Sequence, residues 1–365
     1  MNKQFPTAIA LLLSGLLHLS GCSDNSSDRD HSLMRTTEQL HLLGRYESLE
    51  DENLRFGASG FTIIARFKGT RIEAELRDEF RDGNSYNWFT VFINDEEVNR
   101  FRTQRRQTRY VLADNLADTV HTVKLVKDSE GQNGWVTFEG LYAENFEAPP
   151  ELPARKIEFI GDSITCGAAM DESIHPCGST NRYFDQNRAS HSFGVKLANH
   201  FDAQYMLTAV SGMGMYRNWN SSSPVMPDRY DGIYADFKEG QPEWDHHRYR
   251  PDLIVIGLGT NDFSSGSGES PREPFDEEKF FNTYADFVER IRQLHPQAEI
   301  LHLASPMLDA EREQQHAELL HRIPDAEVHR FEERYTSGCD QHPDVEEHTR
   351  MAEELKPVIA NVIGW

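Results

Sequence analysis

The spacing of apolar residues changes once along this chain, near residue 150, and this change limits the possible folds more than any other feature. Before it, apolar and polar residues alternate, as in Phe61, Ile63, Ala65 and Phe67, which predicts β-strands. Turn-forming residues separate these strands at 68–69, 82–84, 94–95, 114–115 and 131–134. Strands and turns at this spacing favour an antiparallel sandwich.

A proline-rich segment divides the chain. Residues 144–153 carry three prolines in ten positions, which suits a stiff linker without regular structure. Five short apolar runs then predict buried strands at 156–161, 205–210, 252–259, 299–304 and 327–331. Between these runs, apolar residues recur every three to four positions, most clearly at 280–294, which predicts helices. The same spacing follows the last run at 348–362, where Pro357 predicts a kink or a break.

Alternation of strands and helices predicts a mostly parallel sheet with helices on both faces. The expected fold class is therefore α/β: a three-layer domain at 156–365, preceded by an all-β sandwich at 36–148 and a linker at 149–155. Each part is long enough to bury a core of its own.

The N-terminal residues have the features of an export signal. Residues 1–21 carry one Lys near the start and then an apolar stretch too short to span a membrane comfortably. They end in Leu19-Ser20-Gly21-Cys22, which resembles the lipobox of bacterial lipoproteins and implies a lipid on Cys22. Residues 22–35 then form a polar tether. We expect an exported lipoprotein, held at the outer membrane by its lipid alone; the alternative is a plain secretion signal cut elsewhere.

The net charge and the motifs of the chain limit the kinds of partner and cofactor that we expect. The chain has 37 Lys+Arg against 60 Asp+Glu, a formal net charge of −23, which repels nucleic acid and anionic membranes. It contains no phosphate loop or dinucleotide fingerprint, so we expect no cofactor. Adjacent His246 and His247 lack a third ligand at useful spacing, and we expect no metal site.

Cys166, Cys177 and Cys339 remain after Cys22. An exported protein can keep disulfides, and three cysteines allow three different single pairs. The sequence does not decide among these pairs, and Cys166 with Cys177 is the one we expect.

Polar residues and glycines follow several of the predicted parallel strands. Ser163 comes directly after the first strand, Gly212 follows the second, Asn261 follows the third, and His342 lies between the last strand and the closing helix. The carboxyl ends of parallel strands share one edge of the sheet, so these groups are expected to meet there. Gly214 is an alternative to Gly212.

These blocks resemble the SGNH (GDSL-type) hydrolase superfamily over residues 155–365, with GDSIT, the glycine after the second strand, GTND and a late His. The longer strings IEFIGDSITCG, SGMGM, GTNDFS and GCDQHPDVEEHTRMAEEL are more narrowly similar to carbohydrate esterase family 2. This resemblance implies an N-terminal jelly roll joined to a flavodoxin-like SGNH domain. It also implies removal of acetyl groups from plant polysaccharides such as xylan and mannan, with preference for primary O6 positions.

The resemblance implies a role for each residue. Ser163 would be the nucleophile and His342 its base, while the amides of Ser163 and Gly212 and the side chain of Asn261 would hold the oxyanion. The superfamily places an Asp three residues before the His, where this chain has Cys339. Either a backbone carbonyl or Asp340 could therefore orient the imidazole.

Two tryptophans stand in the connections around the third strand. The flat rings of Trp219 and Trp244 could stack on sugar faces at the mouth of a cleft, or they could serve in packing.

The expected activity is that of a serine esterase acting on acetylated carbohydrate through an acyl-enzyme. One alternative is an esterase for bacterial exopolysaccharide, sialic acid or lipid. Another is a glycan-binding lipoprotein without catalysis. The presence of all the expected site residues, Ser163, His342 and Asn261, argues against it.

Overall fold

A computed structural model describes residues 32–365, apart from 35–38, 81–84, 180–182, 235–240 and 267–271. The expected signal sequence, the expected lipid site at Cys22 and residues 22–31 of the expected tether therefore lie outside the described residues, whereas residues 32–34 of that tether form a strand. None of the described helices is long and apolar enough to cross a membrane.

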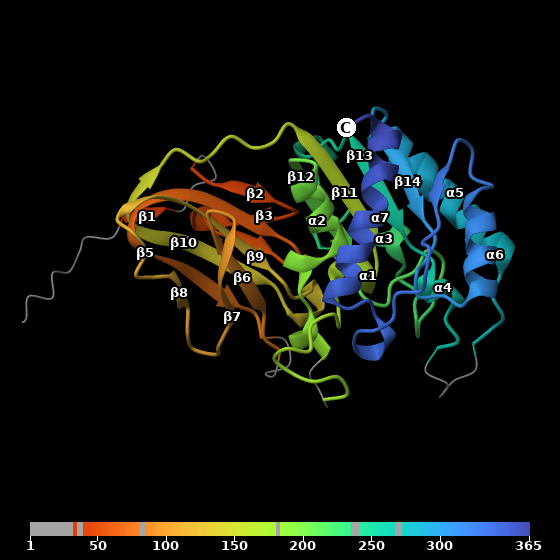
Figure 1. Cartoon of the computed structure of the whole chain (residues 1–365), viewed down its shortest axis with the longest axis horizontal. Coiled ribbons are helices and arrows are strands. Elements are labelled where there is room, and N and C mark those ends of the chain that lie inside the picture. The colour runs from red at the N-terminus through yellow and green to blue at the C-terminus, as the bar shows by residue number, and fades with distance from the viewer. Residues whose placement is uncertain (1–31, 35–38, 81–84, 180–182, 235–240, 267–271) are drawn as a thin grey trace, which may run out of the picture. The chain divides into compact units, whose positions relative to one another are not determined.

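The N-terminal half folds into an antiparallel sheet of ten strands (Figure 1). Its main path runs β3-β4-β10-β5-β9-β6-β7, with β1 paired to β10 and with β2 and β8 paired to β5. The strands are β1 (Ser32–Met34), β2 (His41–Leu43), β3 (Glu47–Ser48), β4 (Leu54–Phe56), β5 (Thr62–Asp78), β6 (Trp88–Ile93), β7 (Glu96–Arg102), β8 (Arg109–Ala113), β9 (Thr119–Lys127) and β10 (Val136–Glu147). Two short 3-10 turns, η1 (Glu50–Glu52) and η2 (Gly131–Asn133), interrupt the connections. The predicted all-β domain is confirmed.

The turn predicted at residues 68–69 is wrong, because strand β5 runs through it. Residues 68–69 lie inside a single strand that continues to Asp78. Gly69 has a φ of +135°, and the register of β5 against β10 shifts between Ala143 and Asn145. A bulge of this kind reverses which residues face inward. Phe67 before it and Ile72 after it, at odd and even positions, consequently enter the same core.

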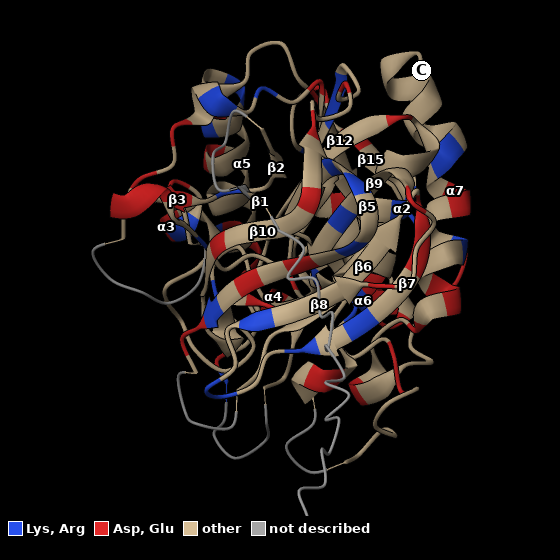
Figure 2. Cartoon of the chain, turned by 90° about the vertical axis from the view of Figure 1, so that its left-hand side faces the viewer, with Lys and Arg blue, Asp and Glu red and all other residues tan. Residues whose placement is uncertain are grey.

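Charged side chains cover the outer surface of this domain. Basic and acidic residues lie side by side on its strands (Figure 2), and the carboxylate of Glu73 accepts from both Arg71 and Arg109 at 2.6 and 2.5 Å. Exposed pairs of this kind contribute little to stability. The apolar residues on the inner face of these strands account for the fold.

The C-terminal half contains a parallel sheet of five strands in the order β12-β11-β13-β14-β15. The strands are β11 (Arg155–Gly161), β12 (Ala203–Ala209), β13 (Leu253–Gly257), β14 (Glu299–Leu303) and β15 (Glu327–His329). The α-helices are α1 (Ser163–Cys166), α2 (Phe193–His200), α3 (Met226–Arg229), α4 (Thr260–Phe263), α5 (Glu277–Leu294), α6 (Ala310–Leu320) and α7 (Val345–Ile363). Short 3-10 helices are η3 (Tyr183–Gln186), η4 (Ala189–His191), η5 (His246–Arg248) and η6 (Cys339–Gln341). No helix or strand occurs at 148–154, between β10 and β11.

The two faces of the parallel sheet bury separate cores. In β13, Leu253 and Val255 pack with residues of α2 and α7, whereas Ile254 and Ile256 pack with residues of α5 and α6. This alternation is the pattern of a strand buried on both sides. The predicted three-layer α/β arrangement is therefore confirmed.

Helix α7 differs from the prediction in one respect. It continues through Pro357 from Val345 to Ile363 without a break. The residues on its inner face, among them Leu355 and Ile359, are fully buried against the sheet. This tertiary packing outweighs the backbone hydrogen bond that a proline removes.

Candidate active site

Ser163 begins helix α1 immediately after strand β11. The side chain of Asp162 caps this helix by accepting the N–H of Ile164 at 3.1 Å. The sharp change from strand to helix places Ser163 at the carboxyl edge of the sheet, where its side chain is 5% exposed. Its hydroxyl Oγ lies 2.8 Å from Nε2 of His342, a residue 179 positions later. The structure thus brings together the two groups expected to react.

Two backbone carbonyls fix the tautomer of His342. Nδ1 lies 3.1 Å from the carbonyl oxygen of Asp340 and 3.3 Å from that of Cys339. A carbonyl oxygen only accepts, so Nδ1 carries the proton and Nε2 offers a lone pair to the Ser163 hydroxyl. This is the tautomer that a general base needs.

Asp340 contributes its main chain to this arrangement. Among the described residues, no hydrogen bond joins its carboxylate to the imidazole, and the residue is exposed on η6. Its φ of +51° belongs to the left-handed region, which turns its carbonyl toward the ring. Of the two alternatives, the geometry favours a serine–histidine dyad oriented by carbonyls.

Burial of the imidazole lowers the pKa of His342 below its ordinary value of 6.5. The two carbonyl bonds and the charge of Asp340 act in the opposite direction. His342 therefore stays neutral, and able to accept a proton, at a more acidic pH than an exposed histidine does.

Gly212 lies in the connection after β12, with a φ of +77° that favours glycine. A Cβ added here would meet only Trp219, at 3.9 Å, so the space beside it is open. Among the described residues the Gly212 N–H has no acceptor. Gly214, the other candidate, already donates its N–H to Oδ1 of Asn218 at 3.0 Å. Gly212 is therefore the better placed of the two to bind an anion.

Asn261, on α4 after β13, comes to the same edge of the sheet. Its Nδ2 donates to Oδ2 of Asp162 at 3.1 Å and to the carbonyl of Met213 at 2.9 Å. These two bonds join the Asn261 amide to the segments that follow β11 and β12. A bond to an oxyanion would have to share one of the two hydrogens that are already engaged.

Two buried carboxylates support the site, although no role was expected for either from its place in the GDSIT and GTND blocks. Burial raises the pKa of Asp162 to about 7 and that of Asp262 to about 6. Asp262 accepts the backbone N–H groups of residues 215–217, and Asp162 holds Asn261. Their place directly beside Ser163 and Asn261 in sequence was the only available signal.

Trp219 and Trp244 have different surroundings. Trp219 is 46% exposed and its backbone N–H donates to the carbonyl of Gly212 at 2.8 Å, so this residue lies beside Gly212. Trp244 is only 5% exposed and packs in a cluster with Trp135 and Tyr249. Of the two alternatives, packing applies to Trp244, because apolar side chains cover its ring.

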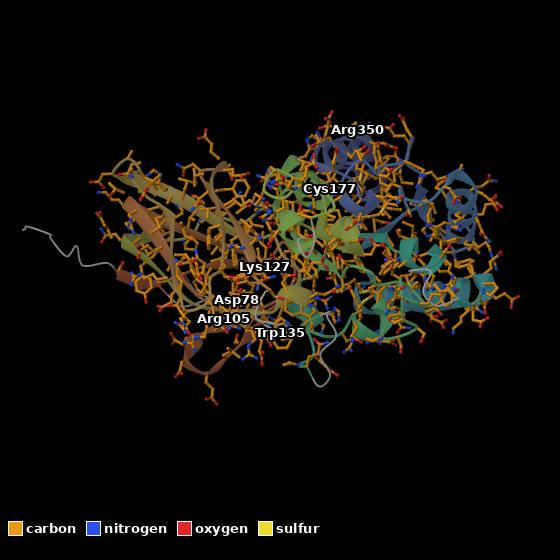
Figure 3. All side chains as sticks on the ribbon, turned by 90° about the horizontal axis from the view of Figure 1, so that it is seen from below. Asp78, Arg105, Lys127, Trp135, Cys177 and Arg350 are labelled. Atoms are coloured by element: carbon orange, nitrogen blue, oxygen red, sulfur yellow. A yellow bond between two sulfur atoms is a disulfide. The ribbon has the colours of Figure 1, made fainter. Side chains whose placement is uncertain are left out.

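The disulfide also differs from the expected pair. Cys177 bonds to Cys339 across 162 residues, and Figure 3 labels Cys177. Cys166 is a free thiol, buried in α1 behind Ser163, and burial raises its pKa. The favoured pair Cys166–Cys177 is therefore wrong. The actual bond ties down Cys339, whose carbonyl accepts from His342.

Several potential metal ligands of the described residues already have other partners. Within the described ranges, Glu172, Cys177 and Cys339 form the one group with suitable spacing, and its two sulfurs are joined to each other. Of the adjacent histidines, His246 contacts Asp231 at 3.3 Å, whereas His247 accepts from Arg250 at 3.0 Å. The two imidazoles do not share a site.

The arrangement has the parts needed for acyl transfer. A serine hydroxyl meets a neutral imidazole, and an open glycine amide and a fixed asparagine amide belong to the neighbouring strand ends. Such a set can form a tetrahedral oxyanion and then an ester on serine. The order of the groups along the chain plays no part in this chemistry.

Comparison with known protein families gives two matches in succession. Residues 42–153 match the model of the carbohydrate esterase 2 N-terminal domain, and residues 159–345 match that of the GDSL-like lipase/acylhydrolase family. An acetylxylan esterase/glucomannan deacetylase from Cellvibrio japonicus is 31% identical over 380 residues, 100% of both chains. The cellulase/esterase CelE of Acetivibrio thermocellus is 29% identical over 344 residues, covering 88% of this chain and 39% of that protein.

Solved structures show the same architecture. A family two carbohydrate esterase from Cellvibrio japonicus superimposes with a TM-score of 0.81 at 28% identity, over 92% of this chain and 99% of that one. A family two carbohydrate esterase from Clostridium thermocellum, solved with cellohexaose, gives a TM-score of 0.77 at 26% identity, over 89% of this chain and 99% of that one.

Proposed function

This chain belongs to carbohydrate esterase family 2, and from this membership we propose that it removes O-acetyl groups from xylan- or glucomannan-type polysaccharides, preferring the primary O6 position. It is an acetylxylan-esterase-like carbohydrate esterase. What we propose is the acetyl position that it prefers and the role of each residue in its site. The observation that carries the proposed mechanism is the 2.8 Å contact between Oγ of Ser163 and Nε2 of His342.

The reaction divides into two acyl transfers. His342 takes the proton of the Ser163 hydroxyl while Oγ attacks the acetyl carbonyl, and the same proton then leaves with the sugar oxygen as the C–O ester bond breaks. Water next gives its proton to His342 and attacks the acetyl-serine, which releases acetate and restores the hydroxyl. The amides of Ser163 and Gly212 and the side chain of Asn261 would hold the oxyanion of both intermediates.

The proposed position of the acetyl group rests on family resemblance and on access. An acetyl group on a primary O6 projects away from the sugar ring, so it can enter a buried dyad while the ring itself stays outside. Trp219, exposed beside Gly212, could offer that ring an apolar face.

Xylose has no sixth carbon, which makes the position testable. We expect acetylated glucomannan oligosaccharides to lose 6-O-acetyl groups at least about 10-fold faster, in kcat/KM, than acetylated xylo-oligosaccharides lose acetyl groups from O2 or O3. Time-resolved proton NMR of the two mixtures follows each acetyl signal separately. Equal rates, or earlier loss from O2 and O3, would contradict the preference for O6 while leaving the esterase activity intact.

We further propose that the chain is an exported lipoprotein that carries its lipid on Cys22. The support is the sequence Leu19-Ser20-Gly21-Cys22, together with a disulfide, which is typical of oxidising compartments. Expressed with its full N-terminal segment in a Gram-negative host, the protein should take up labelled palmitate and sediment with membranes. Cys22→Ser should abolish both, and unchanged labelling of this variant would contradict the proposal.

A further inference from the structure

A turn of the N-terminal β domain contacts the connection that carries Gly212. The turn lies between Lys127 and Trp135, both labelled in Figure 3, and includes η2. The buried ammonium of Lys127 donates to the carbonyls of Ser129 and Glu130 at 2.5 and 3.1 Å. The turn is thus held rigidly by bonds within its own domain.

Ser211, the residue before Gly212, makes most of its polar contacts with this turn. Its N–H and its hydroxyl donate to the carboxylate of Glu130 at 2.7 and 2.5 Å. Its carbonyl accepts from Nε2 of Gln132 at 2.9 Å. Two side chains from the β domain therefore hold the main chain of Ser211 from both directions.

The carboxylate of Glu130 is itself fixed. It is buried, with the residue 1% exposed, and it also accepts from Nδ2 of Asn187 at 3.1 Å and from the Cys166 thiol at 3.5 Å. Buried polar groups with this many partners have little freedom to move. Because the Glu130 carboxylate is fixed, its hydrogen bonds restrain the position of Ser211.

The bond to the Ser211 carbonyl also sets the direction of the Gly212 amide. The peptide between Ser211 and Gly212 is trans, and in a planar trans peptide the C=O and the following N–H point in opposite directions. When Gln132 fixes the carbonyl on one side, the Gly212 N–H must point to the other side. That N–H is the one left without an acceptor among the described residues.

We propose that Glu130 and Gln132 of the N-terminal domain are positioning residues for the esterase reaction, because they fix the Ser211–Gly212 peptide so that the Gly212 N–H is preorganised for the oxyanion. This inference rests on the proposed function, in which Gly212 is an oxyanion donor. It makes the β domain part of the catalytic unit and not only an attached module. Neither residue touches the reacting atoms.

The substitution Gln132→Glu gives the sharpest test. Glutamate has the same shape but cannot donate, and its charge repels the Ser211 carbonyl, so the peptide should rotate. We expect kcat for an aryl acetate to fall about 10- to 100-fold, because an oxyanion donor that is misplaced but present costs less than one that is removed. KM and the midpoint of thermal unfolding should stay close to the wild-type values.

Two further variants separate positioning from general damage. Gln132→Lys restores an N–H donor on a chain of similar reach, and should recover a large part of kcat. Gln204→Glu is the matched control, because Nε2 of Gln204 also donates to a backbone carbonyl, that of Pro153, at 2.7 Å. This control should keep the wild-type kcat. Each rate is divided by the concentration of active enzyme, which is counted by labelling the reactive serine to completion with diethyl p-nitrophenyl phosphate.

The outcomes are distinct. An unchanged kcat per labelled site in Gln132→Glu, beside an inactive Ser163→Ala protein, overturns the positioning inference alone. An equal fall in Gln204→Glu also overturns it, since the loss is then not specific to this peptide. Equal rates in wild type and Ser163→Ala overturn the proposed function and the inference together. If Gln132→Glu does not fold, Gln132→Ala and Glu130→Gln carry the same expectation without an added charge.

Discussion

Replacing Ser163 with alanine is expected to lower kcat for acetyl ester hydrolysis by at least about 10³-fold. The Ser163 hydroxyl lies 2.8 Å from the only imidazole that it contacts among the described residues, so no second nucleophile is placed to replace it. What remains in the variant is substrate binding and the oxyanion donors. Initial rates on an aryl acetate, measured with the wild-type protein and with the variant, give the ratio directly.

Ser192→Ala is a suitable control for this comparison. Ser192 is fully buried, and its hydroxyl has no hydrogen-bond partner among the described residues. Its loss should leave kcat unchanged, which separates the removal of a nucleophile from the removal of a buried hydroxyl. The proposed mechanism would be untenable if Ser163→Ala retained the wild-type rate, or if Ser192→Ala lost as much.

The edge of the sheet on which the site lies could be predicted from the sequence. Ser163 and Asn261 each follow a run of apolar residues that can only be a buried strand, and Gly212 follows a third such run. Parallel strands bring their carboxyl ends to one edge whatever the loops between them do. His342 arrives there on the segment before α7, which packs on the same sheet. These are consequences of periodicity, which is a local property of the chain.

The long-range pairings could not be predicted in this way. Cys177 bonds to Cys339 and not to nearby Cys166, because α1 turns the Cys166 side chain into the protein interior. Trp244 is covered by Trp135 of the other domain. Nothing in the residues around Cys166 or Trp244 encodes such contacts, which depend on how distant segments pack.

Glu130 and Gln132 illustrate the same limit at the site itself. In sequence they are ordinary polar residues of a turn, about 80 positions before Ser211, whose main chain they bind. A turn between strands predicts exposed polar residues, yet the Glu130 carboxylate is buried and bonded to Ser211. Only the contact between the two domains gives these residues a function, so the supporting groups of a site are harder to predict than its reacting groups.

Removing the imidazole should have the second large effect. His342→Ala is expected to lower kcat by at least about 10³-fold, whereas Asp340→Asn should leave it within about threefold, because main-chain carbonyls and not the Asp340 carboxylate accept from Nδ1. The double variant with Ser163→Ala should be no slower than Ser163→Ala alone, since the two residues act as one unit. The measurement is kcat for each variant on the same aryl acetate.

The pH dependence of kcat/KM distinguishes the two ways of orienting His342. Activity needs the neutral imidazole, so it is present above the pKa of His342 and is lost as the pH falls through it. Because burial lowers this pKa, the acid limb should lie below pH 6.5. The charge of Asp340 raises the pKa, so Asp340→Asn should move the limb to slightly lower pH at nearly full kcat. A loss on the order of 10⁴ in this variant would instead establish a triad.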